Sequence, residues 1–237
     1  MEVSEAPEFR QALIKKIAER EFAERTGTHC SDLLYCLNKQ ALRRRLGDQP
    51  TEQDTLLFSL GWATQRWLSH KWTDEAPIEM DGILVTCDAN AMSILANPNT
   101  VTMFFIPWEL KCTYQSSSKD IMDNPAWIRQ IMAQCYVQNI ATAVLTRFEL
   151  MGNWKSVFGK KGEKDLPENG RPSLHAYTFK FTSEELAQNW DWLRNRKVMF
   201  EALLAGGELL PKILAIPSGQ SYECDWCRFK GVECLVE

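Results

Sequence analysis

The chain has 237 residues, of which 45% are apolar and 24% are charged. These values are typical of a globular protein with one large domain and a buried core. No run of eighteen apolar residues occurs and the charged N-terminal segment lacks an apolar signal core, so we expect a cytoplasmic protein without a membrane span. A net charge of −4 argues against a general nucleic-acid coat protein, but not against a nucleic-acid enzyme with a local basic channel.

The first third of the chain has helical periodicity. We expect helices over residues 7–25, 31–47 and 54–72. The second begins at Ser31, a favourable N-cap residue, and ends at Gly47, a favourable C-cap signal.

The pattern then changes to short runs rich in β-branched and aromatic residues. Residues 78–95 predict two short strands with a turn near Asn90, and residues 99–114 predict one or two more strands. A helix should follow, because Asn124 can cap it and Pro125 suits its first position.

Two further strands are expected over residues 143–154 and 173–182, joined by a polar, glycine-bearing segment. The last long helix should begin at a capping box formed by Thr182 and end near Gly206.

This order predicts an α/β (mixed α+β) fold, with a mixed central sheet flanked by helices in one domain, 1–237. We expect it to divide into a helical N-terminal part (1–75), a core (76–206) and a C-terminal segment (207–237).

Three cysteines near the C-terminus, Cys224, Cys227 and Cys234, have the spacing C-x2-C-x6-C. In a reducing compartment such a cluster predicts a metal centre rather than disulfides. A four-ligand set needs one more group from upstream, for which Cys36 is the first choice and Cys30 the second. His29 or His175 could serve a zinc site, and the spacing alone leaves zinc and iron–sulfur both open.

An acidic pattern occupies the predicted sheet. Glu109 and Lys111 are two apart on a strand and so share one face, and Asp88 follows an upstream strand. Two carboxylates suit Mg²⁺ or Mn²⁺, and a lysine beside them could orient a water that attacks a phosphodiester. Each part alone is weak, because surface salt bridges and turn residues give the same pattern.

Polar residues elsewhere add to this pattern. Gln130 and Gln134 lie four apart on one helical face and could reach a phosphate or the carboxylates, although an exposed polar stripe explains them equally well. Basic residues form two groups, each of which is also typical of a solvated surface: Lys39, Arg43, Arg44 and Arg45, and Lys155, Lys160, Lys161 and Lys164.

Together, the segments SDLLYCLNKQALRR, LGWATQRWL, GILVTCDA, WELK, RQIMAQCY and CDWCRFKGVEC resemble the motifs of RecB-type PD-(D/E)XK nucleases. The order and spacing are most similar to the CRISPR-associated iron–sulfur exonucleases (Cas-four), from about residue 28 to residue 236. The resemblance implies a [4Fe–4S] cluster held by four cysteines: Cys36, Cys224, Cys227 and Cys234. It also implies Mg²⁺ or Mn²⁺ bound by Asp88, Glu109 and the Leu110 carbonyl, with Lys111 and Gln130 as further catalytic residues.

Two positions depart from the family pattern. Gln65 stands where the family has a metal-binding histidine and is expected to touch the metal through water; His70 lies about 140° around the helix from it. Gln134 stands at the motif tyrosine, with Tyr136 two residues later.

The resemblance implies a metal-dependent exonuclease that acts on single-stranded or frayed DNA ends and trims DNA for CRISPR spacer acquisition, with the Cas integrase complex as a partner. Two alternatives stay open. One is a RecB-like nuclease of phage or host recombination and repair. The other is a cluster-containing DNA-binding module with weakened catalysis, which Gln65 favours.

Overall fold

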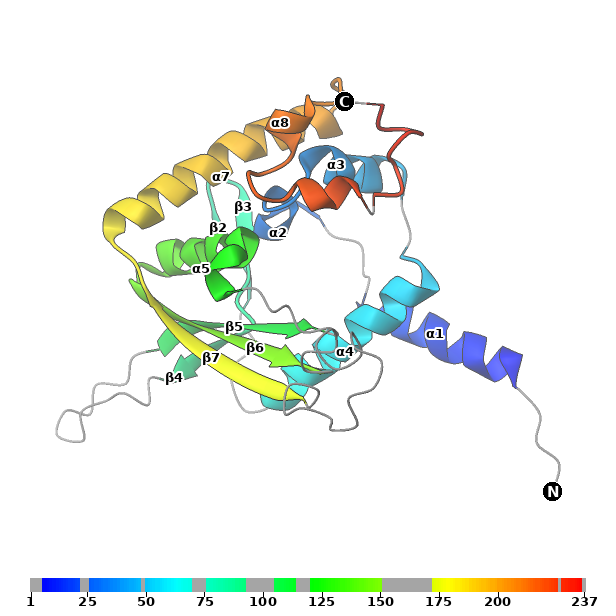
Figure 1. The fold of residues 1–237 in the computed structure, drawn as a ribbon, viewed down its shortest axis with the longest axis horizontal. Helices are drawn as coiled ribbons and strands as arrows, with labels where there is room; N and C mark the ends of the chain where they lie inside the picture. The colour runs from blue at the N-terminus through cyan, green and yellow to red at the C-terminus, as the bar shows by residue number, and fades with distance from the viewer. Residues whose placement is uncertain are drawn as a thin grey trace, which may run out of the picture.

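Figure 1 shows the fold of the chain in a computed structural model. The structure describes residues 6–21, 26–47, 50–69, 76–92, 105–113, 120–150, 172–225 and 227–235. Its helices and strands, in chain order, are α1 (Pro7–Glu21), β1 (Thr28–His29), α2 (Cys30–Leu33), α3 (Leu37–Arg45), α4 (Glu52–Leu68), β2 (Ile78–Met80), β3 (Ile83–Val85), β4 (Ala89–Met92), β5 (Phe105–Thr113), the 3-10 helix η1 (Ile121–Asp123), α5 (Pro125–Gln138), β6 (Thr142–Glu149), β7 (Ser173–Lys180), α7 (Ser183–Leu204), α8 (Lys212–Ala215) and the 3-10 helix η3 (Ser221–Cys224).

A four-stranded mixed sheet forms the centre, in the order β4-β5-β6-β7. β5 and β6 are parallel because the chain crosses over between them through α5, while β4 and β7 pair antiparallel at the two edges. A second sheet has the order β1-β3-β2. The predicted mixed sheet with flanking helices is therefore confirmed.

The two faces of the central sheet carry different side chains, because residues alternate along each strand. Leu145 of β6 packs with Ile131 of α5, and its parallel partner on β5 is Glu109, so Glu109 also faces α5. On the opposite face, Leu110 packs with Leu68 of α4.

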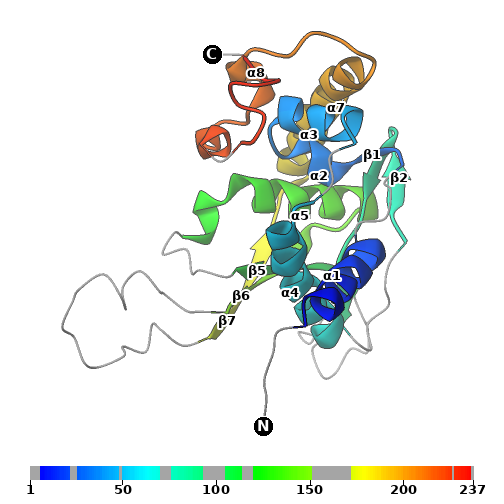
Figure 2. The same cartoon turned by 90° about the vertical axis from the view of Figure 1, so that its right-hand side faces the viewer.

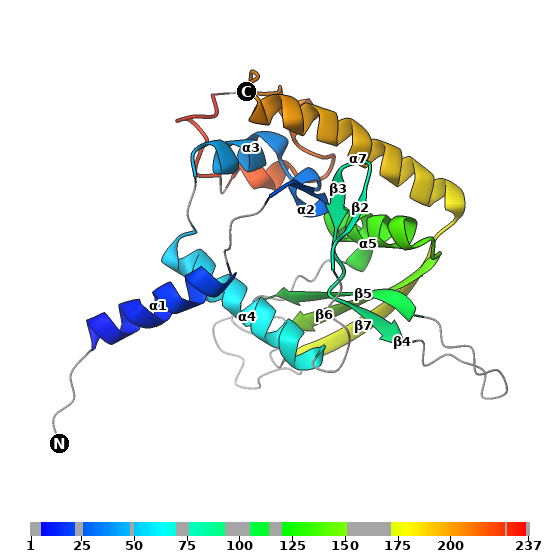
Figure 3. The same cartoon turned by 180° about the vertical axis from the view of Figure 1, so that it is seen from behind.

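Helix α5 lies between the central sheet and a group of helices that contains α2, α3 and α7 (Figures 1 and 2). The main core fills this space and is built on Trp190, Leu193 and Phe200 of α7, which pack with Leu33 and Leu37. Viewed from behind, α1 and α4 lie side by side (Figure 3), joined by an ion pair between Arg10 and Glu52.

The C-terminal segment is tied to the start of α3. Both carboxylate oxygens of Glu223 accept the backbone N–H of Cys36, at 3.2 and 3.1 Å. The buried guanidinium of Arg196 donates to four backbone carbonyls, those of Leu33, Tyr35, Leu214 and Ala215.

The expected single helix over residues 31–47 is wrong, because the chain forms two helices with a break between them. Cys36 has an extended ψ of 114° and is the N-cap residue of α3. The carbonyls of Leu33 and Tyr35 are each bound by Arg196 at 2.6 Å, so a tertiary contact replaces the helical hydrogen bonds there.

The expected turn near Asn90 is also wrong. Asn90 lies in β4, opposite Pro107 of β5. The turn is at Asp81 and Gly82, which have φ of 52° and 71° and join β2 to β3. Asp-Gly is a strong signal for such a hairpin, because both central residues need a positive φ.

The other elements are confirmed as far as the structure describes them, while residues 22–25, 70–72, 93–104, 114 and 151–171 of the expected ranges lie outside the described residues. The helices expected at 7–25 and 54–72 are α1 and α4, and Thr51 and Asp54 form a capping box at the start of α4. Asn124 and Pro125 begin α5, and the capping box at Thr182 begins α7. The division of the single domain into three parts stays a prediction.

Candidate active site

The predicted carboxylates meet at the border of β4 and β5. Asp88 directly precedes β4, whose first residue, Ala89, pairs with Trp108. The Oδ2 atom of Asp88 accepts the Leu110 backbone N–H at 2.7 Å. Glu109, next to Leu110 on β5, is only 2% exposed. The two carboxylates predicted to bind metal are thus brought together.

Lys111 lies on the same face of β5 as Glu109. Its Nζ atom is 2.6 Å from Oε1 of Glu109 and 2.8 Å from Oε1 of Gln130 on α5. The Nε2 atom of Gln130 donates to Glu109 Oε1 at 2.7 Å, which closes a triangle of polar groups. Gln130 therefore reaches a carboxylate of the site, one of the two contacts that the sequence left open for it.

Gln134 is a site residue whose importance sequence reasoning underestimated. It is fully buried, and its Nε2 atom donates to Oε2 of Glu109 at 2.5 Å and to the Thr86 carbonyl at 3.0 Å. The four-residue spacing from Gln130 was the available signal, because it puts both amides on the helical face toward the sheet. Tyr136, by contrast, stacks on Trp190 with ring centroids 5.0 Å apart.

The electrostatics of the site reflect two crowded carboxylates. Burial, and then the charge of Glu109, raise the pKa of Asp88 to about 7, although the Leu110 N–H and Lys111 oppose the shift. Burial lowers the pKa of Lys111, but the charge of Glu109 and other neighbours outweigh it, so the net shift is upward. Lys111 is therefore an ammonium ion at neutral pH.

This donor set fits a hard divalent cation. Two carboxylates share one site, and burial, then the charge of Glu109, raise the pKa of Asp88; a bound cation would oppose both effects. Among the described residues, no three His, Cys, Asp or Glu side chains gather closely enough to hold a metal. An ion here would need backbone and water oxygens too, as is usual for Mg²⁺.

Gln65 lies on α4, which packs against the face of the central sheet opposite to α5. Gly61 and Thr64 of α4 lie against Cys112, whose Sγ atom is 4.0 Å from the Thr64 hydroxyl oxygen. Within the described part of the chain, no hydrogen bond joins the Gln65 side chain to either carboxylate, so its contact with a metal stays a prediction. His70 lies outside the described residues.

Some of the cysteines predicted to bind a metal centre lie close together. Cys36 packs with Cys224 in a small buried cluster. Burial raises the pKa of the Cys36 thiol to about 11, and the nearby Glu223, Cys224 and Cys227 add to the rise while the Lys39 N–H opposes it. The tail reaches Cys234 through turns in which its N–H donates to the Phe229 carbonyl at 2.8 Å.

The alternative fourth ligands lie elsewhere. Cys30 belongs to the main core, where burial and the charge of Glu109 raise its pKa to about 12. The His29 ring contacts the Thr26 carbonyl at 3.2 Å, and His175 lies on β7. The structure thus brings Cys36, rather than these residues, close to Cys224 and Cys227, and a place for Cys234 beside them stays a prediction.

The first basic group has a role in the fold. Arg44 contacts Oδ2 of Asp32 at 2.5 Å and lies over the Phe200 ring, and Arg45 donates to the Leu203 carbonyl at 3.5 Å. The second basic group, from Lys155 to Lys164, lies outside the described residues.

Solved structures of other proteins are similar to this chain to different degrees. The crystal structure of SSO0001 superposes with a TM-score of 0.55 at 13% identity, covering 95% of this chain and 94% of that one. A phage-related exonuclease from Haemophilus somnus 129PT gives a TM-score of 0.46 at 10% identity, over 77% of this chain and 96% of its own. An alkaline exonuclease (LHK-Exo) from Laribacter hongkongensis gives 0.42 at 11% identity, over 81% and 95%.

The fold is therefore that of SSO0001. No protein-family model and no curated protein matches the sequence. Among the described residues, no helix is both long and apolar enough to cross a membrane.

Proposed function

We propose that this protein is a metal-dependent deoxyribonuclease. One observation carries the proposal: the buried Glu109 carboxylate accepts from Lys111, Gln130 and Gln134, and Asp88 lies beside it. Burying two carboxylates and an ammonium ion is costly for stability, so such a group indicates a functional site.

Each side chain has a defined task in phosphodiester hydrolysis. Asp88 and Glu109, with the Leu110 carbonyl, would hold Mg²⁺ or Mn²⁺. Such an ion lowers the pKa of a bound water and neutralises charge on the phosphate. Lys111, held between Glu109 and Gln130, donates hydrogen bonds that orient the attacking water and stabilise negative charge on the phosphate oxygens.

The finer role rests on the sequence resemblance. In this role, the protein is an exonuclease that trims single-stranded or frayed DNA ends for CRISPR spacer acquisition, with the Cas integrase complex as its partner. A RecB-like role in phage or host recombination and repair uses the same chemistry. One observation favours the alternative of a DNA-binding module with weakened catalysis. Gln65 stands where the family that the sequence resembles has a metal-binding histidine.

The test is digestion of single-stranded DNA with Mn²⁺ or Mg²⁺, and with EDTA as the metal-free control. Lys111→Ala and Glu109→Gln should each lower the cleavage rate by about 10²–10⁴-fold, because both act on the reacting groups. Lys197→Ala is a matched control, since Lys197 forms a similar ion pair with Glu201 on α7, at 2.9 Å. A folded Lys111→Ala variant that cleaves as fast as the parent would show that the proposal is wrong.

We further propose that Cys36, Cys224, Cys227 and Cys234 hold a [4Fe–4S] cluster. Four thiolates are the usual ligands of such a cluster. The packing of Cys36 against Cys224, and the effect of Cys227 on the Cys36 pKa, support this set. The cluster would join the C-terminal segment to the start of α3.

A further inference from the structure

A strip of polar side chains continues from the candidate active site across the sheet. Lys111 pairs in register with Arg147 of β6, and Arg147 pairs with His175 of β7. Paired residues on neighbouring strands point to the same face, so these three side chains share the face of Glu109. The next row toward the strand ends is also polar. The polar strip is defined as Lys111, Thr113, Arg147, Glu149, Ser173 and His175.

The rest of this face is apolar. Ala143 and Leu145 of β6, together with Tyr177 and Phe179 of β7, pack with Ile131 of α5. This half behaves as expected for a sheet face covered by a helix. The change from Leu145 to Arg147, one step along the same face, therefore marks the point where apolar side chains end and buried polar side chains begin.

A buried ion pair occupies the centre of the strip, and its guanidinium also lies over the Tyr177 ring, 6.0 Å from the ring centroid. Arg147 is 7% exposed and Glu149 is 6% exposed, and the Arg147 Nε atom is 2.9 Å from Glu149 Oε1. The Ser173 hydroxyl donates to the other oxygen of Glu149 at 2.8 Å. A buried ion pair costs desolvation energy that its attraction barely repays, and apolar residues often replace such pairs without loss.

We propose that Arg147 binds a phosphate of the DNA strand next to the phosphate that is cleaved at Lys111. Adjacent strands are about 4.8 Å apart, so Arg147 lies one strand from the reacting group. A guanidinium fork matches phosphate oxygens, and Glu149 acts as a positioning residue that fixes its orientation. The inference rests on the proposed nuclease function and adds a substrate-binding subsite to it.

The strip also indicates the direction of approach. His175 lies on the edge strand β7, and its side chain is 45% exposed, whereas Arg147 and Lys111 lie further in. A strand of DNA that crosses β7 would therefore meet His175, then Arg147, and reach Lys111 last.

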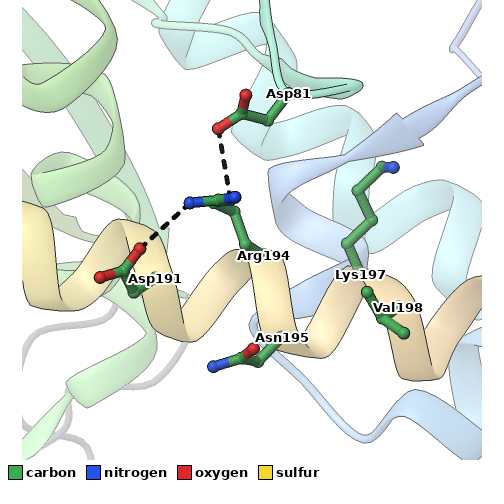
Figure 4. Close-up of a pocket in the computed structure, with 6 residues that line it drawn as sticks. All are labelled: Asp81, Asp191, Arg194, Asn195, Lys197 and Val198. Carbon is green, nitrogen blue, oxygen red and sulfur yellow. Dashed lines mark hydrogen bonds and ion pairs between the residues drawn. The ribbon is translucent and has the colours of Figure 1, made fainter.

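A pocket beside α7 provides a control arginine (Figure 4). Arg194 there lies 3.5 Å from an oxygen of Asp81 and 3.4 Å from one of Asp191. Like Arg147, Arg194 is ion-paired, but its side chain is 55% exposed and lies on α7 rather than on the sheet. Arg194→Gln therefore removes an ion-paired arginine outside the polar strip.

The experiment replaces single phosphates of a single-stranded oligonucleotide by neutral methylphosphonates, one position at a time. In the parent protein, one substitution next to the cleaved bond should lower kcat/KM by about 10–100-fold, the value of a hydrogen bond to a charged group. Arg147→Gln should lower kcat/KM similarly on natural DNA, and should then be insensitive to that one methylphosphonate. Arg194→Gln should behave like the parent.

Arg147→Lys is a second variant that keeps the charge but loses the fork, and should show an intermediate effect. If every methylphosphonate lowers cleavage equally in the parent and in folded Arg147→Gln, the subsite is wrong while the nuclease function stands. If both variants lose the fold, as judged by thermal melting, Arg147 is a structural residue and the inference is overturned.

The same scan, measured as equilibrium Kd in EDTA, separates the two proposals. A position-specific loss of binding that disappears in Arg147→Gln supports the subsite even if the parent fails to cleave DNA. In that case the proposed nuclease function would be the part that is wrong.

Discussion

Asp88 links the chemistry of the site to the pH dependence of folding. Its pKa is about 7 in the folded chain, against an ordinary value of 3.8. The folded state therefore favours the neutral carboxyl. This contribution to stability is fully present below pH 4 and is lost as the pH rises from about 4 to about 7. Its upper size is on the order of 4 kcal/mol, from a shift of about three pH units.

We expect the free energy of unfolding of the metal-free protein to fall between pH 5 and pH 8 by more in the parent than in Asp88→Asn, whose amide cannot ionise. The measurement is chemical denaturation in EDTA at both pH values. Asp191→Asn, which changes an exposed carboxylate of α7, should behave like the parent. Equal falls in the parent and in Asp88→Asn would contradict the assigned shift. Added Mn²⁺ should restore stability at pH 8 only in the parent.

The residues of the site differ in how far the sequence predicts them. Asp88, Glu109 and Lys111 follow from short patterns, because strand alternation alone puts Glu109 and Lys111 on one face. Glu223 and Arg196 could not be found this way. Each acts on backbone groups more than 150 residues away in the sequence, which only the folded chain brings into contact. The position of Arg147 beside Lys111 could not be predicted from the sequence, because it depends on the register between β5 and β6.

At the scale of elements, the tail and the start of α3 act as one unit, and this can be tested by cysteine substitution. Protein purified without air should be brown and contain iron, from the proposed four-thiolate cluster. Cys36→Ala should lose both iron and colour, and should lower the melting temperature. Cys30→Ala should keep the iron, because Cys30 packs in the main core rather than against the tail.

Two results of this comparison would count against the cluster. Zinc without iron under anaerobic handling would show that the four thiols hold a different metal. Loss of iron in Cys30→Ala, with retention in Cys36→Ala, would show that the fourth ligand is misassigned.

Sequence patterns predicted most elements, and the exceptions have physical causes. Local signals placed the starts of α5 and α7 correctly. A capping box at Thr182 begins α7, whereas α5 begins at Pro125 and the Asn124 side chain makes no capping hydrogen bond. The break between α2 and α3 could not be predicted, because Arg196 of α7 competes for the backbone carbonyls there. The hairpin at Asp81 and Gly82 could have been predicted from its Asp-Gly pair.

At the scale of the whole molecule, the proposed function requires a negatively charged chain to bind a negatively charged polymer. The net charge of −4 gives no general attraction, so affinity has to come from local cations that meet phosphates. Arg44 and Arg45 are engaged in packing α3 against its neighbours. The polar strip contains a different set of cations, Lys111 and Arg147, which form the proposed path of the DNA strand into the site.

Binding of single-stranded DNA should therefore weaken with salt and vary little with sequence, because phosphates carry the interaction. The measurement is Kd in EDTA over a range of salt concentrations, for several unrelated oligonucleotides of equal length. Each phosphate contact contributes about −0.7 to the slope of log K against log salt for single strands. Arg147→Gln should make the slope shallower by about that amount, whereas Arg194→Gln should leave it unchanged. Tight binding that does not respond to salt, or that differs widely among the oligonucleotides, would show that base contacts rather than phosphate contacts hold the strand.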